Sequence, residues 1–431
     1  MRTLLFTGKG GDGTSTVAAA TAARLARGGD KTLLLSVHPA HHLADTLGVP
    51  VGAEPAEIGA GLYAARVDTR RGLGQSWPML RDLLDSLSPL GDGSSVSADE
   101  LALLPAVEPT LALLQVRDHA NSGRWDTMVL DCATTVDALR LVALPTTLAW
   151  YVGRLVAHHR PTRPASGTPA TTVGALAEAV ADLRMTLAEV DSLLRSADTS
   201  VRLVLTPRAA AVAEARRTAT ALALHGHLLE EVVVTQVLPD QTSRHGGEGD
   251  DRYQGWVRSQ QRQLALIAEL FADVPVRRVP RQVDEPVGVA ALLDLADQAI
   301  GLEDPSSSAG PVEGRPHGQG RGTAGPSVRV DQVADGFEWA LRLPLVERDQ
   351  LDLARVDDGL VVTLDDHRRV IPLPAVLRRC TVEGARLADG WLRVRFRPDP
   401  ARWPTALLSA ADRWAHPSTV GGTDGVEVVE Q

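Results

Sequence analysis

The sequence predicts a doubly wound, mostly parallel α/β domain followed by a small all-β domain. Three observations support this prediction. A glycine-rich stretch, GKGGDGTST at residues 8–16, connects an apolar run to a helix-forming run at the start of the chain. Further apolar runs then alternate with helix-forming segments up to residue 301. Beyond a segment rich in Gly, Pro and Ser, the pattern changes to short strand-like runs separated by turn residues.

The predicted α/β domain, residues 1–302, opens with the strand 3–7, the glycine-rich loop and a helix over 15–29 that two glycines end. Its further strands are expected at 31–37, 126–131, 201–206 and 230–238. These runs are continuously apolar, which is typical of strands buried on both faces of a parallel sheet. Helices are expected at 208–224 and 253–271, and the run PVRRVP with a helical segment at 287–300 closes the domain.

Two further segments, 70–120 and 171–197, are predicted to be mostly helical insertions. The first contains a stretch whose apolar residues share one helical face: Met79, Leu80, Leu83, Leu84 and Leu87.

Residues 303–330 are predicted to be a flexible linker, because Gly, Pro and Ser dominate and little apolar surface is available for burial. Residues 331–398 follow as a small all-β sandwich of short strands. In its run FEWALRLPL, the side chains of Trp339, Leu341 and Leu343 share one face. Residues 399–431 are expected to be a loose tail.

The composition narrows the classes of function. The chain has 431 residues and a net charge of -10, which argues against general nucleic-acid binding. Its two cysteines, Cys132 and Cys380, form no C-x-x-C pair, so we expect neither a disulfide framework nor a cysteine-only zinc site. No apolar run is long enough for a signal peptide or a transmembrane helix, so a cytoplasmic protein is expected.

The glycine-rich loop indicates phosphate binding. A turn of this kind between a strand and a helix directs backbone N–H groups and the positive end of the helix dipole towards an anion. Four glycines provide the turn: Gly8, Gly10, Gly11 and Gly13. Ser15 occupies the place of the hydroxyl that holds Mg²⁺ in a P-loop.

Four motifs in order resemble the ArsA/GET family of arsenite-pump and tail-anchored-protein-targeting ATPases. They are the loop 8–16, the strand ending in SVHPAHHLAD, the segment WDTMVLDCATTVDALRLVALP, and the strand VVVTQVLP. The all-β domain resembles the α-crystallin-like, small-heat-shock-like module of many bacterial members. The resemblance implies a P-loop NTPase core with a deviant Walker A motif, ATP and Mg²⁺ as ligands, and a dimer. It also implies nucleotide contacts for Thr16 and a Mg²⁺ contact for Asp131.

The departures from the family pattern fall on nucleotide chemistry. Thr14 replaces the P-loop lysine, Asp12 adds an acid, and His38 replaces the aspartate that orients the attacking water. Thr134, Val136 and Asp137 replace the Pro, Gly and His of the second switch, and Thr235 replaces the adenine-contacting asparagine. Loss of a lysine–phosphate contact costs about 1.5–3 kcal/mol. An ionised Asp12 about 4 Å from a phosphate oxygen adds up to about 4 kcal/mol of repulsion at an effective dielectric constant of about 20.

The sequence therefore predicts a pseudo-ATPase: a non-hydrolysing subunit that pairs with an ATPase-competent homologue and holds an apolar protein client. The resemblance implies that Lys9 reaches the partner's nucleotide across a two-fold interface. Two alternatives stay open, a weak ATP-hydrolysing, anion-pump-type ATPase in its own right and a chaperone-like binding module. The three histidines His38, His41 and His42 are interpreted as a polar turn rather than a metal site.

Overall fold

The structure is a computed structural model that describes residues 1–37, 42–68, 107–132, 134–158, 170–239, 248–299, 328–365 and 367–403. The chain forms two compact units, Met1–Gly325 and Pro326–Gln431. Each unit has its own sheets and its own buried core.

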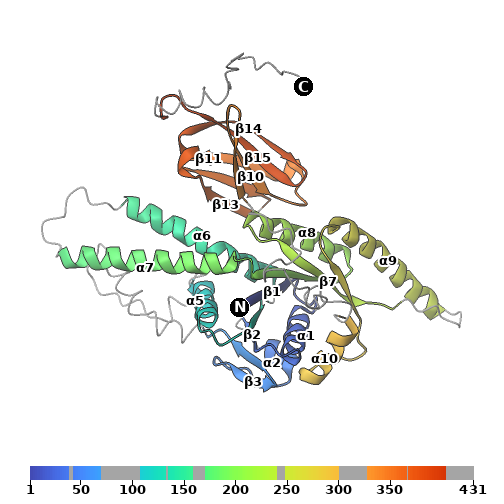
Figure 1. Ribbon diagram of the computed structural model, residues 1–431. Helices are drawn as coiled ribbons and strands as arrows, with labels where there is room; N and C mark the ends of the chain where they lie inside the picture. The colour runs from blue at the N-terminus through green and yellow to red at the C-terminus, as the bar shows by residue number, and fades with distance from the viewer. Residues whose placement is uncertain are drawn as a thin grey trace, which may run out of the picture. The chain divides into compact units, whose positions relative to one another are not determined.

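An eight-stranded sheet forms the centre of the first unit (Figure 1). Its strands pair in the order β3 (Ala56–Gly59), β4 (Leu62–Arg66), β2 (Thr32–Ser36), β5 (Thr127–Asp131), β1 (Arg2–Gly8), β6 (Thr199–Leu205), β7 (Leu229–Val237) and β8 (Val276–Pro280). All neighbours are parallel except β3 and β4. The chain runs from β1 to β2 on one side and later from β5 to β6 on the other. The carboxyl end of β1 therefore lies at a topological switch point, where open α/β sheets bind ligands.

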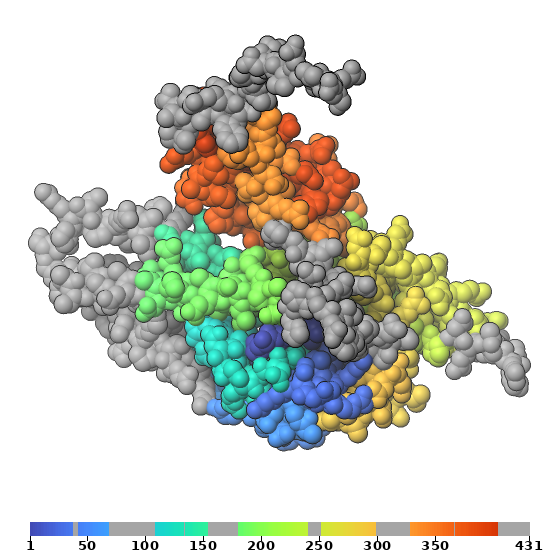
Figure 2. Space-filling view, in the orientation of Figure 1, coloured from blue at the N-terminus to red at the C-terminus, as the bar shows by residue number. Residues whose placement is uncertain are grey.

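Helices cover both faces of this sheet (Figure 1). One face packs against α1 (Thr14–Arg27), α2 (His42–Leu47) and α10 (Gly288–Ala299). The other packs against α5 (Val107–Asn121), α6 (Thr135–His158), α7 (Ala170–Leu194) and α8 (Ala209–Leu224). Helices α6 and α7 lie side by side (Figure 2), and α9 (Glu248–Leu270) contacts α8. None of the described helices is long and apolar enough to cross a membrane.

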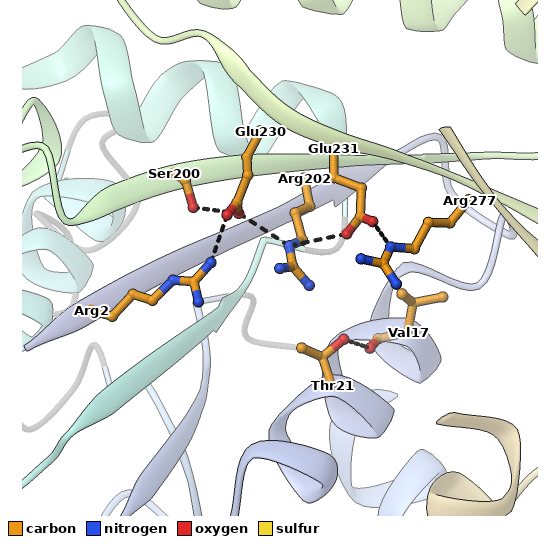
Figure 3. Close-up of polar contacts among 8 residues, drawn as sticks. All are labelled: Arg2, Val17, Thr21, Ser200, Arg202, Glu230, Glu231 and Arg277. Carbon is orange, nitrogen blue, oxygen red and sulfur yellow. Dashed lines mark hydrogen bonds and ion pairs between the residues drawn. The ribbon is translucent and has the colours of Figure 1, made fainter. Parts of the chain in front are cut away.

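A buried ion network lies on β6, β7 and β8, on the face that α1 and α10 cover (Figure 3). The Arg202 Nε atom lies 3.2 Å from a Glu230 oxygen and 3.3 Å from a Glu231 oxygen. Glu231 also pairs with Arg277, and Glu230 with Arg2. A buried charge is tolerated only when it is paired, and each charged side chain of this network has a partner of opposite charge.

A β-bulge explains why two consecutive glutamates join one network. In the pairing of β6 with β7, Val201 faces Leu229 but Arg202 faces Glu231, so Glu230 is the extra residue. Successive side chains of a regular strand point to opposite faces, and a bulge interrupts that alternation. Both carboxylates therefore reach Arg202.

The second unit is an antiparallel β structure of two sheets. The four-stranded sheet has the order β14 (Cys380–Ala388), β15 (Trp391–Pro398), β10 (Gly336–Arg342) and β9 (Val328–Val333). The three-stranded sheet has the order β11 (Leu351–Val356), β12 (Gly359–Leu364) and β13 (His367–Pro372), and the one-turn helices η1 (Arg348–Gln350) and α11 (Ala375–Arg378) lie in the connections. Trp339, Leu341 and Leu343 are fully buried, as their predicted common face requires.

The predicted fold class is confirmed in both units. The hairpin β3–β4 and the strand β11 were not predicted: these strands have only four to six residues, and β3 and β11 are largely exposed or half-buried, so their pattern is weak. Strand β9 begins at Val328, so its first three residues lie inside the segment predicted as linker. The predicted apolar helix face from Met79 to Leu87 lies outside the described residues, as do residues 303–327 of the linker and the tail from 404. The proposed domain boundaries therefore stay predictions.

Candidate functional site

The glycine-rich loop connects the end of β1 to the start of α1 at the topological switch point. Gly11 and Gly13 have φ values of 88° and 83°, which side chains other than glycine rarely adopt. At Gly8, a Cβ atom would lie 2.3 Å from the Val204 carbonyl oxygen, so only glycine fits against β6 there. The loop is thus built as a phosphate-binding loop is, with the first turn of α1 directed outwards.

A pocket of about 530 Å³ lies in front of this loop. Residues 10–17 form one wall, and residues 279–286, between β8 and α10, form the opposite wall. His42, Thr134, Thr235, Gln236 and Leu295 complete the lining. The pocket therefore contains Gly10, Gly11, Asp12, Gly13, Thr14, Ser15 and Thr16, all of which were predicted from the sequence. Lys9 and Asp131 are not among its lining residues.

Asp12 is buried and directed towards the end of β6. Its Oδ1 atom accepts a hydrogen bond from the Thr206 hydroxyl at 2.9 Å, and within the described part of the chain its buried Oδ2 atom has no partner. Burial raises the pKa of Asp12, although Thr206 and the charges of Lys9 and Arg208 act in the opposite direction. The side chain does not point into solvent, so water does not screen the repulsion predicted between an ionised Asp12 and a phosphate.

Thr14 stands in the place of the P-loop lysine and is also buried. Its hydroxyl lies 2.7 Å from the position that a Cβ atom at Gly8 would occupy, so the side chain folds against the end of β1. Among the residues that the structure describes, that hydroxyl has no hydrogen-bond partner. The cradle thus presents a short neutral side chain where a P-loop presents a cation.

Two side chains at the end of β7 donate hydrogen bonds to the backbone of the glycine-rich loop. The Thr235 hydroxyl donates a hydrogen bond of 2.6 Å to the Asp12 carbonyl oxygen, and the Gln236 amide donates one of 3.3 Å to the Gly11 carbonyl oxygen. Gln236 has a φ of 55°, an uncommon conformation for its residue type. Thr235 therefore lines the pocket as predicted, but its hydroxyl is engaged with the loop backbone.

The segment corresponding to the second switch begins α6 with reciprocal capping contacts. The Thr134 hydroxyl donates a 2.6 Å hydrogen bond to the Asp137 carboxylate and accepts one of 3.2 Å from the Asp137 backbone N–H. The Thr7 hydroxyl donates to the Thr134 carbonyl oxygen at 3.0 Å. The Thr135 hydroxyl donates to Glu214 of α8 at 3.1 Å. These contacts fix the start of α6 to β1 and α8 without a ligand.

Comparison with known proteins identifies the family. Residues 1–301 match the family described as anion-transporting ATPase, and residues 334–396 match the HSP20-like domain found in ArsA. The chain belongs to the ArsA/GET family. The resemblance predicted from the sequence motifs is confirmed for both units.

Three relatives show how far the similarity extends. Protein Rv2184c of Mycobacterium tuberculosis is 37% identical over 94% of this chain and 98% of its own length. A putative arsenical pump-driving ATPase of Chlorobaculum tepidum is 30% identical over 92% of this chain and 96% of its own. The ATPase get3 of Aspergillus niger is 26% identical over 70% of this chain and 90% of its own.

The predicted magnesium ligands of this ArsA/GET homologue do not meet in the pocket. Ser15 lines it, whereas Asp131 is buried at the end of β5 outside the lining. The described residues also contain no cluster of three or more His, Cys, Asp or Glu side chains that could hold a metal ion. His38, the residue in place of the water-orienting acid, lies outside the described residues. Of the two predicted magnesium ligands, the pocket therefore presents the Ser15 hydroxyl, and waters and substrate phosphates supply most ligands of Mg²⁺ in sites of this kind.

Lys9 is an exceptional residue in this ArsA/GET chain. The sequence contains 42 arginines but only two lysines, Lys9 and Lys31. The Lys31 ammonium lies 5.4 Å from the centre of the Tyr63 ring and 5.5 Å from that of the Trp125 ring, so it packs as a cation on aromatic faces. Lys9 is exposed on the glycine-rich loop. Lysine and arginine are not interchangeable where a compact ammonium group is required.

Proposed function

We propose that this chain is a non-hydrolysing subunit of an ArsA/GET-type pair, in which an ATPase-competent homologue supplies the active nucleotide site. The observation that carries the proposal is the contrast between Thr14 and Lys9. The side chain inside the cradle is short, neutral and buried, whereas the ammonium group is exposed outside the chain's own pocket. A subunit of this kind contributes a cation to its partner and little to its own site.

The surroundings of Asp12 support weak binding of nucleotide by this chain. A triphosphate in the cradle would approach a buried carboxyl group whose nearby cations, Lys9 and Arg208, lie outside the pocket lining. Repulsion at short range in a partly buried site amounts to a few kcal/mol. Each 1.4 kcal/mol weakens binding tenfold, so affinity for ATP no tighter than millimolar is expected.

The capped start of α6 supports the same proposal. In the ATPase reading, this segment responds to the bound phosphate. Here Thr134 and Asp137 already satisfy each other, and Thr7 and Glu214 hold the neighbouring backbone and hydroxyl. Because the capping hydrogen bonds of this segment are already made, a bound phosphate adds no contacts to it. A phosphate then binds both conformations of the segment about equally and cannot switch one to the other.

Lys9 is the residue proposed to act in the partner's site. A cation placed against the transferring phosphoryl group stabilises the charge that develops there. The test is steady-state ATP turnover by the co-purified complex with Lys9→Ala, Lys9→Arg and Thr14→Ala variants. Lys9→Ala is expected to lower turnover by about 10- to 1000-fold. Thr14→Ala, which alters this chain's own pocket, is expected to change it by less than about threefold.

The two-lysine composition provides a second measurement. An amine-reactive reagent can label only Lys9, Lys31 and the terminal amine, so mass spectrometry resolves each position. Assembly with the partner is expected to protect Lys9 and leave Lys31 reactive as an internal reference. An intact complex with unchanged turnover in Lys9→Ala and with Lys9 unprotected would contradict the trans role.

Apolar residues on the α6–α7 pair favour a second candidate function, the holding of an apolar client. Tyr151 of α6 is 55% exposed and Met185 of α7 is 63% exposed. Exposed apolar side chains mark a binding surface where they form a contiguous patch, and these two are the candidates for such a patch on this helix pair. Tyr151→Ser with Met185→Ser is expected to reduce suppression of the aggregation of an apolar test peptide, measured by light scattering. The matched control Trp256→Ser changes a 63% exposed apolar side chain on α9, away from the pocket lining.

The third reading, a weak ATPase in its own right, makes a different prediction. Turnover by the isolated chain would then be abolished by Ser15→Ala and would be independent of any partner. Turnover that survives Ser15→Ala belongs to a contaminant rather than to this pocket.

A further inference from the structure

The outer face of the four-stranded sheet in the second unit is rich in arginine. Strand β15 places every second side chain on this face, and the register of its neighbours adds further arginines in the same rows. The arginine face consists of Arg329 of β9, Arg342 of β10, Arg386 of β14, and Arg393, Arg395 and Arg397 of β15. The same face carries three acids, Asp331, Glu338 and Glu383. It is therefore positive within a chain whose net charge is -10.

One row of this face juxtaposes like charges. Arg386 lies directly opposite Arg393 in the pairing of β14 with β15. On the other side of Arg393, the small side chain of Ala340 separates it from Arg329. Like charges directly opposite each other destabilise a sheet, and neutral residues are the ordinary choice at such positions. The row therefore concentrates positive charge at a cost in sheet stability.

The acids on the sheet neutralise only part of this charge. Arg393 donates a hydrogen bond of 2.8 Å to Glu338, and Arg397 lies 2.7 Å from a Glu383 oxygen. Arg386 and Arg395 are exposed and form no ion pair with any residue that the structure describes. Trp391 lies in line with Arg393 along β15, and the Arg329 guanidinium stacks on its ring at 5.0 Å. This stacking orients Arg329 without neutralising it.

An acidic segment of the chain follows the strands of this sheet in sequence. The described part of the second unit ends at Trp403, whose ring lies 5.9 Å from that of Phe337 on β10. After 19 further residues comes TDGVEVVE, residues 423–430, with three acids and no basic residue. The segment lies outside the described residues. A tether of this length spans far more than the width of the sheet, and it holds the segment at a millimolar effective concentration.

The interval between successive acids matches the distance between two of the arginines. Asp424, Glu427 and Glu430 recur every third residue. In an extended left-handed helix with three residues per turn, such residues share one face and lie about 9.3 Å apart. Arg329 on β9 and Arg393 on β15 are separated by the strand β10, so they lie two strand spacings, about 9.6 Å, apart. A segment crossing the strands can place two successive carboxylates over Arg329 and Arg393. Arg386 lies one strand spacing, about 4.8 Å, beyond Arg393, between the positions of the second and third carboxylates.

We propose that residues 423–430 dock through Asp424, Glu427 and Glu430 on the arginine face of the second unit. The docked segment occupies this face. The inference does not depend on the proposed function of the nucleotide pocket.

The test uses the full-length chain and a labelled synthetic peptide of residues 421–431. The receptor carries Asp424→Asn, Glu427→Gln and Glu430→Gln, which removes the competing charges of its own tail. Fluorescence anisotropy at low salt is expected to detect binding of the peptide to this receptor. Binding to the unmodified chain is expected to be at least tenfold weaker, because its own segment occupies the face. Binding is expected to disappear at about 1 M salt, where the Debye length is about 3 Å.

Substitutions on the sheet decide where the peptide binds. Arg386→Ala with Arg393→Ala is expected to weaken binding about tenfold. The matched control, Arg348→Ala with Arg368→Ala, removes two exposed arginines elsewhere in the unit and is expected to change binding less than twofold. A thermal melt establishes that every variant is folded. Three outcomes would overturn the proposal: no binding to the neutralised chain, equal binding to both chains, or binding that the arginine-face variants leave unchanged. Binding of single-stranded DNA at the arginine face in the absence of peptide binding would overturn it in favour of a nucleic-acid site.

Discussion

Substitution of Glu231 by glutamine tests the energetic role of the buried ion network. The Glu231 side chain is 4% exposed, and it pairs with the Arg202 and Arg277 side chains, which are 6% and 9% exposed. The change keeps the size of the side chain but removes one of the two negative charges that face Arg2, Arg202 and Arg277. Breaking a buried pair by neutralising one partner costs about 3–5 kcal/mol.

That cost corresponds to a large thermal effect. In a unit of this size, each kcal/mol lowers Tm by about 2–4 °C, so Glu231→Gln is expected to lower it by about 6–20 °C. Differential scanning calorimetry with a parallel urea titration measures the change. The matched control is Asp297→Asn, which breaks the exposed Arg27–Asp297 pair and is expected to cost less than about 1 kcal/mol. If Glu231→Gln costs no more than Asp297→Asn, then water reaches the network and its burial has been overestimated.

Three further predictions follow from the pocket, the network and the chain organisation. The isolated chain is expected to bind ATP–Mg²⁺ no tighter than millimolar, and calorimetry that finds micromolar binding would refute this. The double substitution Thr14→Lys with Asp12→Val is expected to improve that affinity at least tenfold. Burial alone raises the pKa of Glu230, but the charges of Arg202 and Arg2 outweigh it and leave the pKa below its ordinary value. The ionised form therefore stabilises the fold at neutral pH, that stability is lost as the pH falls from about 4.5 through the lowered pKa, and Glu230→Gln is expected to flatten this part of a stability–pH profile. Limited proteolysis is expected to cut first within 303–327, where the composition offers little to bury, and to release two folded pieces; early cleavage elsewhere would place the boundary differently.

The sequence predicted the sheet and the loop well because their signals are local. Continuous apolar runs such as VRLVLT and EEVVVTQVL mark buried strands, and four glycines in six residues leave few structures other than a tight anion-binding turn. The departures at Thr14 and Thr235 were readable in the same way, by comparison with a fixed motif. The reciprocal contacts of Thr134 and Asp137 were missed, although a threonine followed three residues later by an acid is a capping signal.

Other features have no local signal. Asp12 and Thr206 are 194 positions apart, and nothing in either segment announces their hydrogen bond. Short polar strands such as β11 depend on tertiary pairing rather than on propensity. The charged residues Arg202, Glu231 and Arg277 lie within apolar strands, and their pairing depends on a register shift that the sequence pattern does not reveal.

The bulge in β7 has a consequence for how changes of chain length are tolerated in this strand. The extra residue at Glu230 turns the strand by one position, so that Val233 joins the core beneath α1 and Thr235 reaches the Asp12 carbonyl oxygen. Deletion of one residue at the bulge would restore the regular alternation of side chains. The side chains on one side of the deletion would then point to the opposite face of the sheet. Either the glutamates leave the network or Thr235 leaves the loop. The number of residues between the bulge and Thr235 therefore fixes which face of the sheet each side chain of β7 points to. Single-residue insertions or deletions in this strand are expected to be far more damaging than most substitutions.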